Sequence, residues 1–384
     1  MPDSIKGKKL NKGEWAEFYV MMKLLGEGKL YTANELLQKN YQSYLEILKI
    51  LRQECKTHVL EYVIDESNNV VNIQPQGGQI LAKIPIQDFD HYAQVLFDGI
   101  KNLKGNSIPA PDDVCEFAKI IYVSKPKAPA VKSLKSLFGG KSDIFIELRD
   151  GKTSIVSTMG FSIKSKFGNN PTLFNAGSSS QFSFKLLNCN DEIMEKFNTI
   201  TEEGGRGWKQ CVNYLSSCDI TLKFTDTKHQ IYHDNLTLVR DSMATILAWC
   251  IKDRLIDSLA EASHQVMETA QRLIDVNPLG VTNAQFYYEK AIKDFLMAGF
   301  TGMTAGRSWD GREQVNGGYI VVMDDGEVLC YHSNDRESFR DYLYRNTYFE
   351  YVSPEKYNWS YISKIGEDYY LDLNASIRFS KKTR

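Results

Sequence analysis

The amino-acid sequence predicts a mixed fold of the α+β class (mixed α/β), with helices flanking a β-sheet and with several local hairpins. Three observations lead to this prediction. Apolar residues recur at helical spacing in several segments, pairs of apolar runs are separated by short turn sequences, and the two kinds of segment are intermixed along the chain. We find no internal repeat.

The first predicted helix covers residues 13–25. Phe18, Met21 and Leu24 recur at the spacing of one helical face. The sequence GEG follows directly, and its two glycines favour a stop at that point.

Further elements follow in chain order. The amino-terminal half is expected to contain a second helical segment over 41–56, a hairpin over 58–74 that turns at 67–69, helices over 88–103 and 111–121, a mobile Lys-, Pro- and Ser-rich connector over 124–142, and strands over 143–148 and 159–165. The remainder is expected to contain a long, largely helical tract over 235–275, either continuous or broken, a helix over 285–297, a hairpin that turns at Asp325 and Gly326, a helix over 336–346 and a strand over 369–379.

The composition is that of an ordinary globular protein, with 42% apolar and 24% charged residues. No window approaches eighteen uninterrupted apolar residues, and the amino terminus lacks the apolar core of a signal peptide, so a cytoplasmic protein is expected. The seven cysteines are odd in number and scattered, without a CxxC pair. This pattern disfavours a disulfide framework or a structural zinc site.

The formal net charge of −2 conceals a basic segment. Between Phe117 and Asn190 there are eleven basic and three acidic side chains, a local charge of +8, so the rest of the chain carries −10. Such a segment inside an acidic chain favours a polyanionic partner, and Lys132 and Lys135 are candidates for phosphate contacts. A solvated lysine face without a partner is the alternative.

The two strands near the middle of the chain carry residues suited to phosphodiester hydrolysis. Asp143 stands at the head of an apolar run, and if the chain reverses midway through the following loop, Lys164 lies opposite it. A carboxylate is a hard oxygen ligand for Mg²⁺, and a lysine can orient or help deprotonate the attacking water and offset charge on the phosphate. An ordinary hairpin with polar ends is the alternative.

A second carboxylate is missing from its usual place in sites of this kind, two residues before the lysine, where this chain has Ser162. Magnesium sites of this kind usually use more than one carboxylate. Glu14 and Glu17, three residues apart at the start of the first helix, share one face and are the remaining candidates. We expect Glu17 to complete the metal shell, whereas ordinary helix capping is the favoured alternative for Glu14.

A polar loop follows the candidate lysine, and no carboxylate occurs between residues 151 and 190. Neutral donors and acceptors at this density suit hydrogen bonds to base edges, although polar surface loops have a similar composition. The candidate DNA-contacting residues of this segment are Lys166, Asn169, Asn170, Thr172, Asn175, Ser179 and Gln181, and two arginines farther along the chain, Arg307 and Arg312, are candidates for reading guanine.

Several stretches resemble the HpaII-type restriction endonuclease family, which has a PD-(D/E)xK-like nuclease core. In the family's order they are "NKGEWAEFYVMMKLLGEGKLY", "LKILRQE", "SDIFIEL" with "GFSIKS", "NNPTLFNA", and "GGYIVVMDDGEVLCYH" with "NASIRF". The resemblance implies a restriction-endonuclease-like core and Mg²⁺-dependent cleavage of both DNA strands at a short palindrome, CCGG for the namesake, alongside a cognate methyltransferase. A palindrome favours a homodimer by default.

The resemblance also suggests a division of labour along the chain. Residues 1–190 are expected to form the catalytic core with the first helix and the basic connector, and residues 191–384 a helical and hairpin region for DNA recognition or clamping. The Arg-acidic-Arg motif of another group of CCGG-cutting enzymes is absent, since the chain continues "SIKSKFGNN". Two alternatives stay open: a structure- or damage-directed DNA repair nuclease, and a DNA-binding regulator in which Asp143 and Lys164 are only structural.

Overall fold

The computed structural model describes residues 5, 7–34, 36–54, 59–103, 105, 107–127, 134–136, 140, 142–167, 172–202, 207–260, 264–312, 317–332, 336–351 and 360–380, with residues 202 and 207 described by their backbone alone. The chain forms two compact units. The first unit consists of residues 1–171 and 313–342, and the second of residues 172–312 and 343–384. Helices and strands occur together in both units, which confirms the mixed α+β prediction.

In the described residues, the first unit contains the helices α1, α2 and α3 and a large sheet. Its elements are β1 (Lys9–Asn11), α1 (Lys12–Glu27), β2 (Lys29–Ala33), β3 (Lys39–Arg52), β4 (Leu60–Asp65), β5 (Val70–Pro75), β6 (Ala82–Pro85), α2 (Ile86–Asn102), β7 (Ser107–Pro109), α3 (Asp112–Ile120), β8 (Ile144–Asp150), β9 (Val156–Ser165), β13 (Gly318–Val322) and β14 (Val328–His332). The helices predicted over 13–25, 88–103 and 111–121 are therefore confirmed, as are the hairpins β4–β5 and β13–β14.

Nine of these strands form one mixed sheet, in the order β2-β14-β13-β9-β8-β3-β4-β5-β6. A further pairing between β2 and β3 closes the strands from β2 through β14, β13, β9 and β8 to β3 into a ring. Most neighbours are antiparallel, but β13 runs parallel to β9 and β14 parallel to β2. Within this ring β8 is flanked on both sides, and its apolar residues are buried on both faces, as its sequence predicts.

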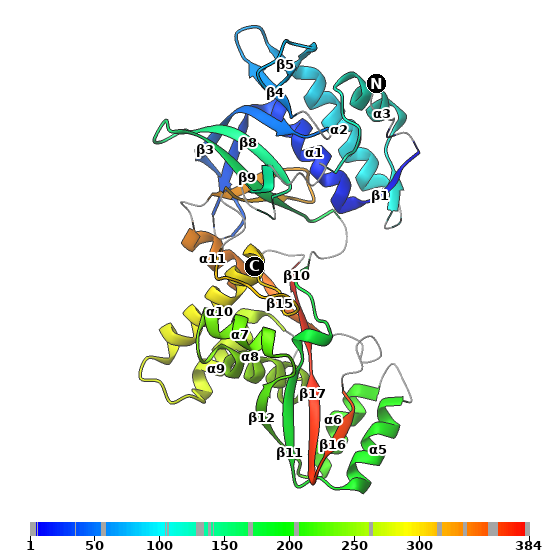
Figure 1. Cartoon of the computed structure of the whole chain (residues 1–384), viewed down its shortest axis with the longest axis vertical. Helices are drawn as coiled ribbons and strands as arrows, with labels where there is room; N and C mark the ends of the chain where they lie inside the picture. The colour runs from blue at the N-terminus through cyan, green and yellow to red at the C-terminus, as the bar shows by residue number, and fades with distance from the viewer. Residues whose placement is uncertain are drawn as a thin grey trace. The chain divides into compact units, whose positions relative to one another are not determined.

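Helix α1 lies in the core of the first unit and has clear signals at both ends. Asn11 and Glu14 form a capping box at its start, and Gly28, with φ 67°, ends it in the left-handed conformation that glycine favours. Most of its side chains are buried, because α1 packs against β3, β9 and α2 (Figure 1). A charged residue in the middle of α1 is therefore held against the sheet.

The second unit combines smaller sheets with a group of helices. Its elements are β10 (Thr172–Phe174), β11 (Phe182–Leu187), α5 (Asp191–Glu202), α6 (Gly207–Ser217), β12 (Thr221–Thr227), α7 (Gln230–Val239), α8 (Met243–Lys252), α9 (Val266–Val276), α10 (Ala284–Thr301), β15 (Thr347–Tyr351), β16 (Ile362–Ile365), β17 (Asp368–Leu373) and β18 (Ala375–Phe379). Helix α11 (Arg336–Arg345) spans the boundary between the units.

The strands of the second unit form an antiparallel sheet in the order β12-β11-β17-β16 and a second one in the order β10-β18-β15. Helix α5 packs beside β16, and α8 packs beside β12 (Figure 1). The predicted tract over 235–275 is interrupted: α7, α8 and α9 are separate helices, with a π-helical turn at Asp253–Asp257. The strand predicted over 369–379 is two strands, which part at Asn374 and join different sheets.

The prediction of a helix over 41–56 is wrong, because most of this segment forms strand β3. A bulge between Ile47 and Lys49 interrupts the alternation of the strand: Leu45 and Ile47 are buried before it and Ile50 after it, so the period-two pattern that marks a strand is broken. Strand β3 pairs with β2, β4 and β8, and these tertiary contacts outweigh the local pattern.

The compact units also divide the chain at other residues than the expected boundary after Asn190. The hairpin β13–β14 continues the large sheet beyond β9, so it belongs to the first unit although it lies far along the chain. The segment after Pro171 joins the second unit through β10 and β11. The functional roles expected for the two regions stay predictions.

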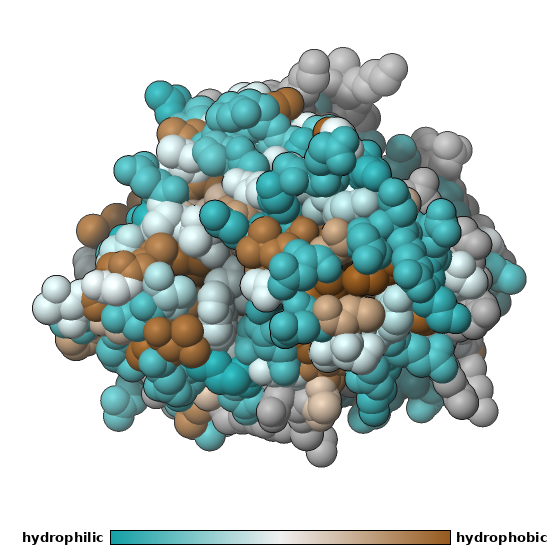
Figure 2. Space-filling model, turned by 90° about the horizontal axis from the view of Figure 1, so that it is seen from below, coloured by the Kyte–Doolittle hydropathy of each residue, from teal (hydrophilic) through white to brown (hydrophobic). Residues whose placement is uncertain are grey.

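Among the described residues, no helix is both long enough and apolar enough to cross a membrane. The face seen in Figure 2 shows small apolar patches separated by polar side chains. Scattered apolar side chains of this kind are usual on a protein surface exposed to water.

Candidate active site

Asp143 and Lys164 are carried by the neighbouring strands β8 and β9. Asp143 directly precedes β8, and its backbone N–H donates to the carbonyl oxygen of Phe161 at 2.8 Å. The register places Phe161 opposite Ile144, so Ser162 faces Asp143 and the predicted alignment with Lys164 is wrong by two residues. Lys164 still shares the sheet face of Ser162, because side chains two apart on a strand point the same way.

Hydrogen bonds from β9 fix the Asp143 carboxylate. Ser162 Oγ and the Ile163 backbone N–H both donate to Asp143 Oδ2, at 3.0 and 2.9 Å. Both bonds go to the same oxygen, so the bonds found among the described residues leave Oδ1 for another ligand. Ser162 therefore does not replace the second carboxylate expected at its position; it orients the first one.

Glu17 of α1 is buried beside Asp143. Its side chain is 11% exposed, and among the described residues its Oε2 has no hydrogen-bond partner. Burial, followed by the negative charge of Asp143, raises the pKa of Glu17 from 4.5 to about 7, although Lys127 and Arg52 oppose the rise. A buried carboxylate oxygen without a partner is costly, and such an atom is typical of a functional site.

Glu14 lies one turn earlier on α1 in a different environment. Its Oε2 accepts a hydrogen bond from Asn11 N at 3.0 Å, and its own N–H donates to Asn11 Oδ1 at 2.9 Å. This capping box accounts for Glu14 without any metal. Of the two glutamates considered from the sequence, the structure brings Glu17 into the buried cluster.

Lys164 completes this cluster. Burial lowers its pKa, while the negative charges of Asp143 and Glu17 oppose that effect. A lysine whose pKa is lowered is neutral more often than a solvated one and can then accept a proton, and its charged form still attracts phosphate. We refer to Glu17, Asp143, Ser162 and Lys164 as the candidate cleavage site.

The donor atoms of the candidate cleavage site suit a hard divalent cation. Within the described ranges, no group of three or more His, Cys, Asp or Glu side chains could hold a metal ion, so the site offers two carboxylates, Asp143 and Glu17. Mg²⁺ is often held by one or two carboxylates, with waters and substrate phosphates as its other ligands. The buried Oε2 of Glu17, which has no partner among the residues that the structure describes, therefore fits a metal ligand.

One functional candidate was missed in the sequence. Lys127 Nζ lies 3.7 Å from Glu17 Oε1, at the edge of the candidate cleavage site, and its own side chain is 58% exposed. The connector that contains Lys127 shows only a high lysine content. Nothing in that pattern distinguishes this lysine from its neighbours.

The structure describes only some of the DNA-contacting candidates in the first unit. The pKa of Lys166 is lowered by burial, while Asp324 and Asp325 of the β13–β14 turn oppose this shift. Lys135 is half-buried in a short helical turn. Lys132, Asn169 and Asn170 lie outside the described residues.

In the second unit, candidates from distant parts of the sequence lie side by side. Thr172 is in β10, Asn175 is exposed just after it, and Ser179 is in a short 3₁₀ helix. Gly306 approaches Ser179 so closely that a Cβ atom at Gly306 would lie 3.3 Å from Ser179 Oγ. The polar segment and the arginine-containing loop are therefore neighbours. Gln181, in contrast, is only 2% exposed, so its side chain has little surface to offer to a base.

The loop at residues 304–312, here called the arginine loop, is held by a buried side chain. Asn235 of α7 donates through Nδ2 to the carbonyl oxygens of Thr304 and Arg307, at 2.9 and 2.8 Å, and its Oδ1 accepts from Trp309 N at 3.0 Å. Arg307 is exposed on this loop, and the side chain of Arg312 is 87% exposed. Asn235 thus fixes the backbone while the arginine side chains face solvent.

Comparisons with known proteins identify the family of this chain. The family model of the HpaII restriction endonuclease matches residues 11–379. The chain is 33% identical to the type II restriction enzyme HpaII of Haemophilus parainfluenzae over 374 residues, which covers 96% of this chain and 98% of that enzyme. No solved structure matches the chain. The chain therefore belongs to the HpaII restriction endonuclease family, and it is a type II restriction endonuclease.

Proposed function

We propose that this enzyme uses Mg²⁺ to hydrolyse phosphodiester bonds in both strands of double-stranded DNA at a short palindrome, CCGG, the site implied by the family resemblance. The observation that carries the metal-dependent part is the buried Oε2 of Glu17, which has no hydrogen-bond partner within the described ranges and lies beside Asp143. A carboxylate that needed only structural partners would be expected to have them.

Asp143 and Glu17 are the residues that would hold the metal. When bound, Mg²⁺ would supply positive charge at a phosphate oxygen and acidify the attacking water. Ser162 contributes by holding Asp143 Oδ2, at 3.0 Å, in a fixed orientation. Lys164 orients the water, helps to remove its proton and offsets negative charge on the phosphate. The water oxygen bonds to phosphorus, one P–O ester bond breaks, and the leaving oxygen takes a proton from solvent.

We propose that polar side chains of the second unit recognise the DNA bases. Arg307 and Arg312 suit the O6 and N7 acceptors of guanine, and Asn175 and Ser179 suit other base edges or phosphates. Lys135 and Lys166 supply positive charge for the DNA backbone. Thr172, which lies in β10 and pairs with Arg378 of β18, and the buried Gln181 have less surface for such contacts.

Two partners follow from a palindromic site and are proposed with it. A two-fold symmetric target is matched by a homodimer, which sedimentation of the DNA-free enzyme would detect. A restriction enzyme also requires that the host's own sites be protected, so we propose a cognate methyltransferase that acts on the same sequence. Sites premethylated by such an enzyme are expected to resist cleavage.

The test is cleavage of duplexes that carry CCGG or one of its single-base variants, with Mg²⁺, with Ca²⁺ or with a chelator. We expect cutting of both strands of CCGG with Mg²⁺, binding without cutting with Ca²⁺, and no cutting with the chelator. A replication fork and a duplex with a lesion serve as controls. Preference for either control would contradict the proposed substrate, and binding without cutting at every metal concentration would contradict the proposed reaction.

A further inference from the structure

Lys127 is a cation at the edge of the candidate cleavage site, and it has no role in the reaction proposed above. Its Nζ lies 3.7 Å from Glu17 Oε1, and its charge acts on the pKa values of both Glu17 and Lys164. More than half of its side chain is exposed, so it can reach a molecule that approaches from solvent. Lys164, in contrast, has its pKa lowered by burial.

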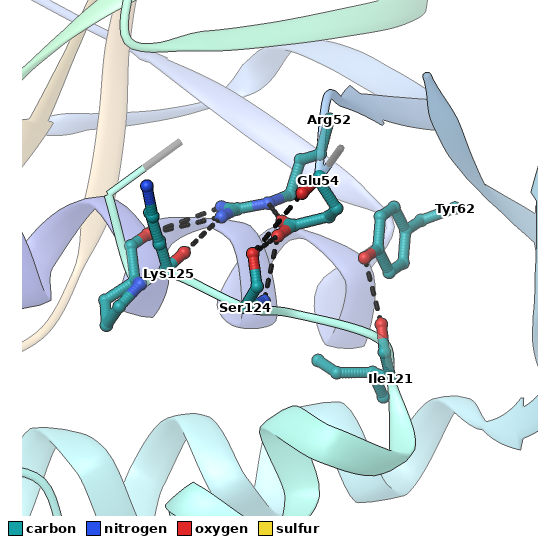
Figure 3. A network of polar contacts seen from close by, with 7 residues as sticks. Arg52, Glu54, Tyr62, Ile121, Ser124 and Lys125 are labelled. Atoms are coloured by element: carbon teal, nitrogen blue, oxygen red, sulfur yellow. Dashed lines mark hydrogen bonds and ion pairs between the residues drawn. The ribbon is translucent and has the colours of Figure 1, made fainter. Parts of the chain in front are cut away.

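The backbone that leads to Lys127 is held by a buried ion pair (Figure 3). Arg52, at the end of β3, donates through Nε to Glu54 Oε1 at 2.6 Å and through Nη2 to the carbonyl oxygen of Lys125 at 2.6 Å. Its guanidinium also lies 3.4 Å from the carbonyl oxygen of Pro126. These contacts fix the two residues that directly precede Lys127.

Glu54 holds the same segment from its other oxygen. Glu54 Oε2 accepts hydrogen bonds from the backbone N–H and from the Oγ of Ser124, both at 2.8 Å. Just upstream, the hydroxyl of Tyr62 donates to the carbonyl oxygen of Ile121 at 2.9 Å (Figure 3). The segment is therefore tied to the sheet at several successive residues.

This ion pair contributes little net stability to the fold, because removing two charges from water costs free energy. The side chains of Arg52 and Glu54 are 4% and 5% exposed, and apolar residues of similar volume often stabilise a protein as well as a buried ion pair does. An apolar pair could not, however, bind the carbonyl oxygens of Lys125 and Pro126 or the N–H of Ser124. The contribution that only the ion pair can make is to hold the backbone of residues 124–126 in place.

We propose that Lys127 binds a DNA phosphate at the candidate cleavage site, and that Arg52 and Glu54 are the positioning residues that hold it there. The inference rests on the proposed function, because it assumes that DNA is the substrate. A phosphate contact of this kind carries no sequence information, so Lys127 contributes to binding of all DNA sequences alike.

The first test measures binding of CCGG and unrelated duplexes in Ca²⁺ over a range of salt concentrations. Lys127→Gln is expected to weaken binding to both duplexes by the same factor, on the order of tenfold. The negative slope of log affinity against log salt concentration is expected to become less steep by about 1. Lys127→Arg is expected to restore both values. Lys119→Gln is the matched control, because Lys119 is also in the basic segment but pairs with Glu116 at 2.7 Å on the surface of α3.

The second test asks whether the ion pair acts through Lys127. The double variant Arg52→Met, Glu54→Leu is expected to lose as much DNA affinity as Lys127→Gln, and adding Lys127→Gln to it is expected to cause no further loss. If the double variant does not fold, Ser124→Ala, which removes the hydroxyl that donates to Glu54, is combined with Lys127→Gln in the same way. A smaller loss that again disappears in the Lys127→Gln background is then expected.

Three results would overturn the inference. Binding that Lys127→Gln leaves unchanged, in a parent enzyme that cuts CCGG, would overturn the role of Lys127 and leave the proposed function intact. If the losses in DNA affinity add when Lys127→Gln is combined with the double variant, and add again when it is combined with Ser124→Ala, the role of the ion pair would be overturned. A parent enzyme that neither binds nor cuts DNA would overturn the proposed function, and this inference with it.

Discussion

The candidate cleavage site and the arginine loop each depend on one buried polar side chain, and the two side chains differ in how fully they are hydrogen-bonded. Asn235 uses its amide in three hydrogen bonds to the loop backbone. Glu17 keeps one carboxylate oxygen that has no partner within the described part of the chain. A satisfied buried group indicates a structural role, whereas an unsatisfied one indicates a ligand that binds later.

The largest expected effect concerns the groups that act on the reacting atoms. Asp143→Ala and Lys164→Ala are each expected to lower the cleavage rate by on the order of 10³-fold or more, while DNA binding in Ca²⁺ is mostly retained. Single-turnover cleavage and a parallel binding assay measure the two effects. Lys152→Ala, in the exposed turn after β8, is the control, and normal cutting by either site variant would remove that residue from the mechanism.

Glu17 should also lower the stability of the free enzyme, in contrast to Asn235. Its pKa rises from 4.5 to about 7 on folding, so the folded protein binds a proton more tightly than the unfolded chain between these values. Stability should therefore fall as pH rises from 4.5 to 7. Without metal, Glu17→Gln is expected to stabilise the protein by up to about 3 kcal/mol at pH 8, and by less at pH 5.

Urea unfolding of the parent and Glu17→Gln at pH 5 and pH 8 measures this difference. Glu14→Gln is the matched control, because glutamine can replace glutamate in the capping box, and its stability should follow that of the parent at both pH values. A Glu17→Gln variant that is less stable than the parent at pH 8 would mean that the carboxylate has partners in solution.

Asn235→Ala tests the opposite side of the comparison. It leaves one N–H and two carbonyl groups of the arginine loop without their partner, so we expect a loss of about 2 kcal/mol in the free energy of unfolding. Discrimination between CCGG and its single-base variants should fall as well. Asn198→Ala is the control, since Asn198 makes two similar bonds to Ile362 of β16 and should affect stability alone.

The smallest effects are expected for single base contacts. Arg307→Ala, Arg312→Ala and Asn175→Ala should each cost roughly 1 to 3 kcal/mol at one base pair and relax selectivity there. Lys135→Ala should instead weaken binding to all sequences alike. A binding screen over every single-base variant of CCGG separates these outcomes, and uniform losses for the arginine variants would make them phosphate contacts.

The sequence predicts well those features that depend on local signals. The apolar stripe and the glycines that follow it predict α1, and the Asp325-Gly326 turn predicts the hairpin β13–β14. The same stripe also carries Glu14 and Glu17, which the sequence marks as charges on a core-facing side of the helix. These inferences need only residues that are close together in the sequence.

The features that depend on tertiary pairing could not be predicted in this way. The bulge near Ile47 breaks the alternation that would mark a strand, and the position of the turn after β8 shifts the register of Asp143 by two residues. Lys127 and Asn235 carry no local signal at all, because their roles depend on partners far along the chain. The pairing of β13 with β9, which sets the division into two units, is of the same kind.

The Mg²⁺ concentration needed for half-maximal cleavage of CCGG, compared among the parent, Glu17→Gln and Glu14→Gln, tests the central claim most directly. We expect the requirement of Glu17→Gln to rise at least about tenfold, or cleavage to be lost, because a neutral amide is a poorer magnesium ligand than a carboxylate. Glu14→Gln should match the parent, whose own requirement should rise as pH falls below about 7, where Glu17 takes up a proton. A requirement that Glu17→Gln leaves unchanged, or that only Glu14→Gln shifts, would contradict the account.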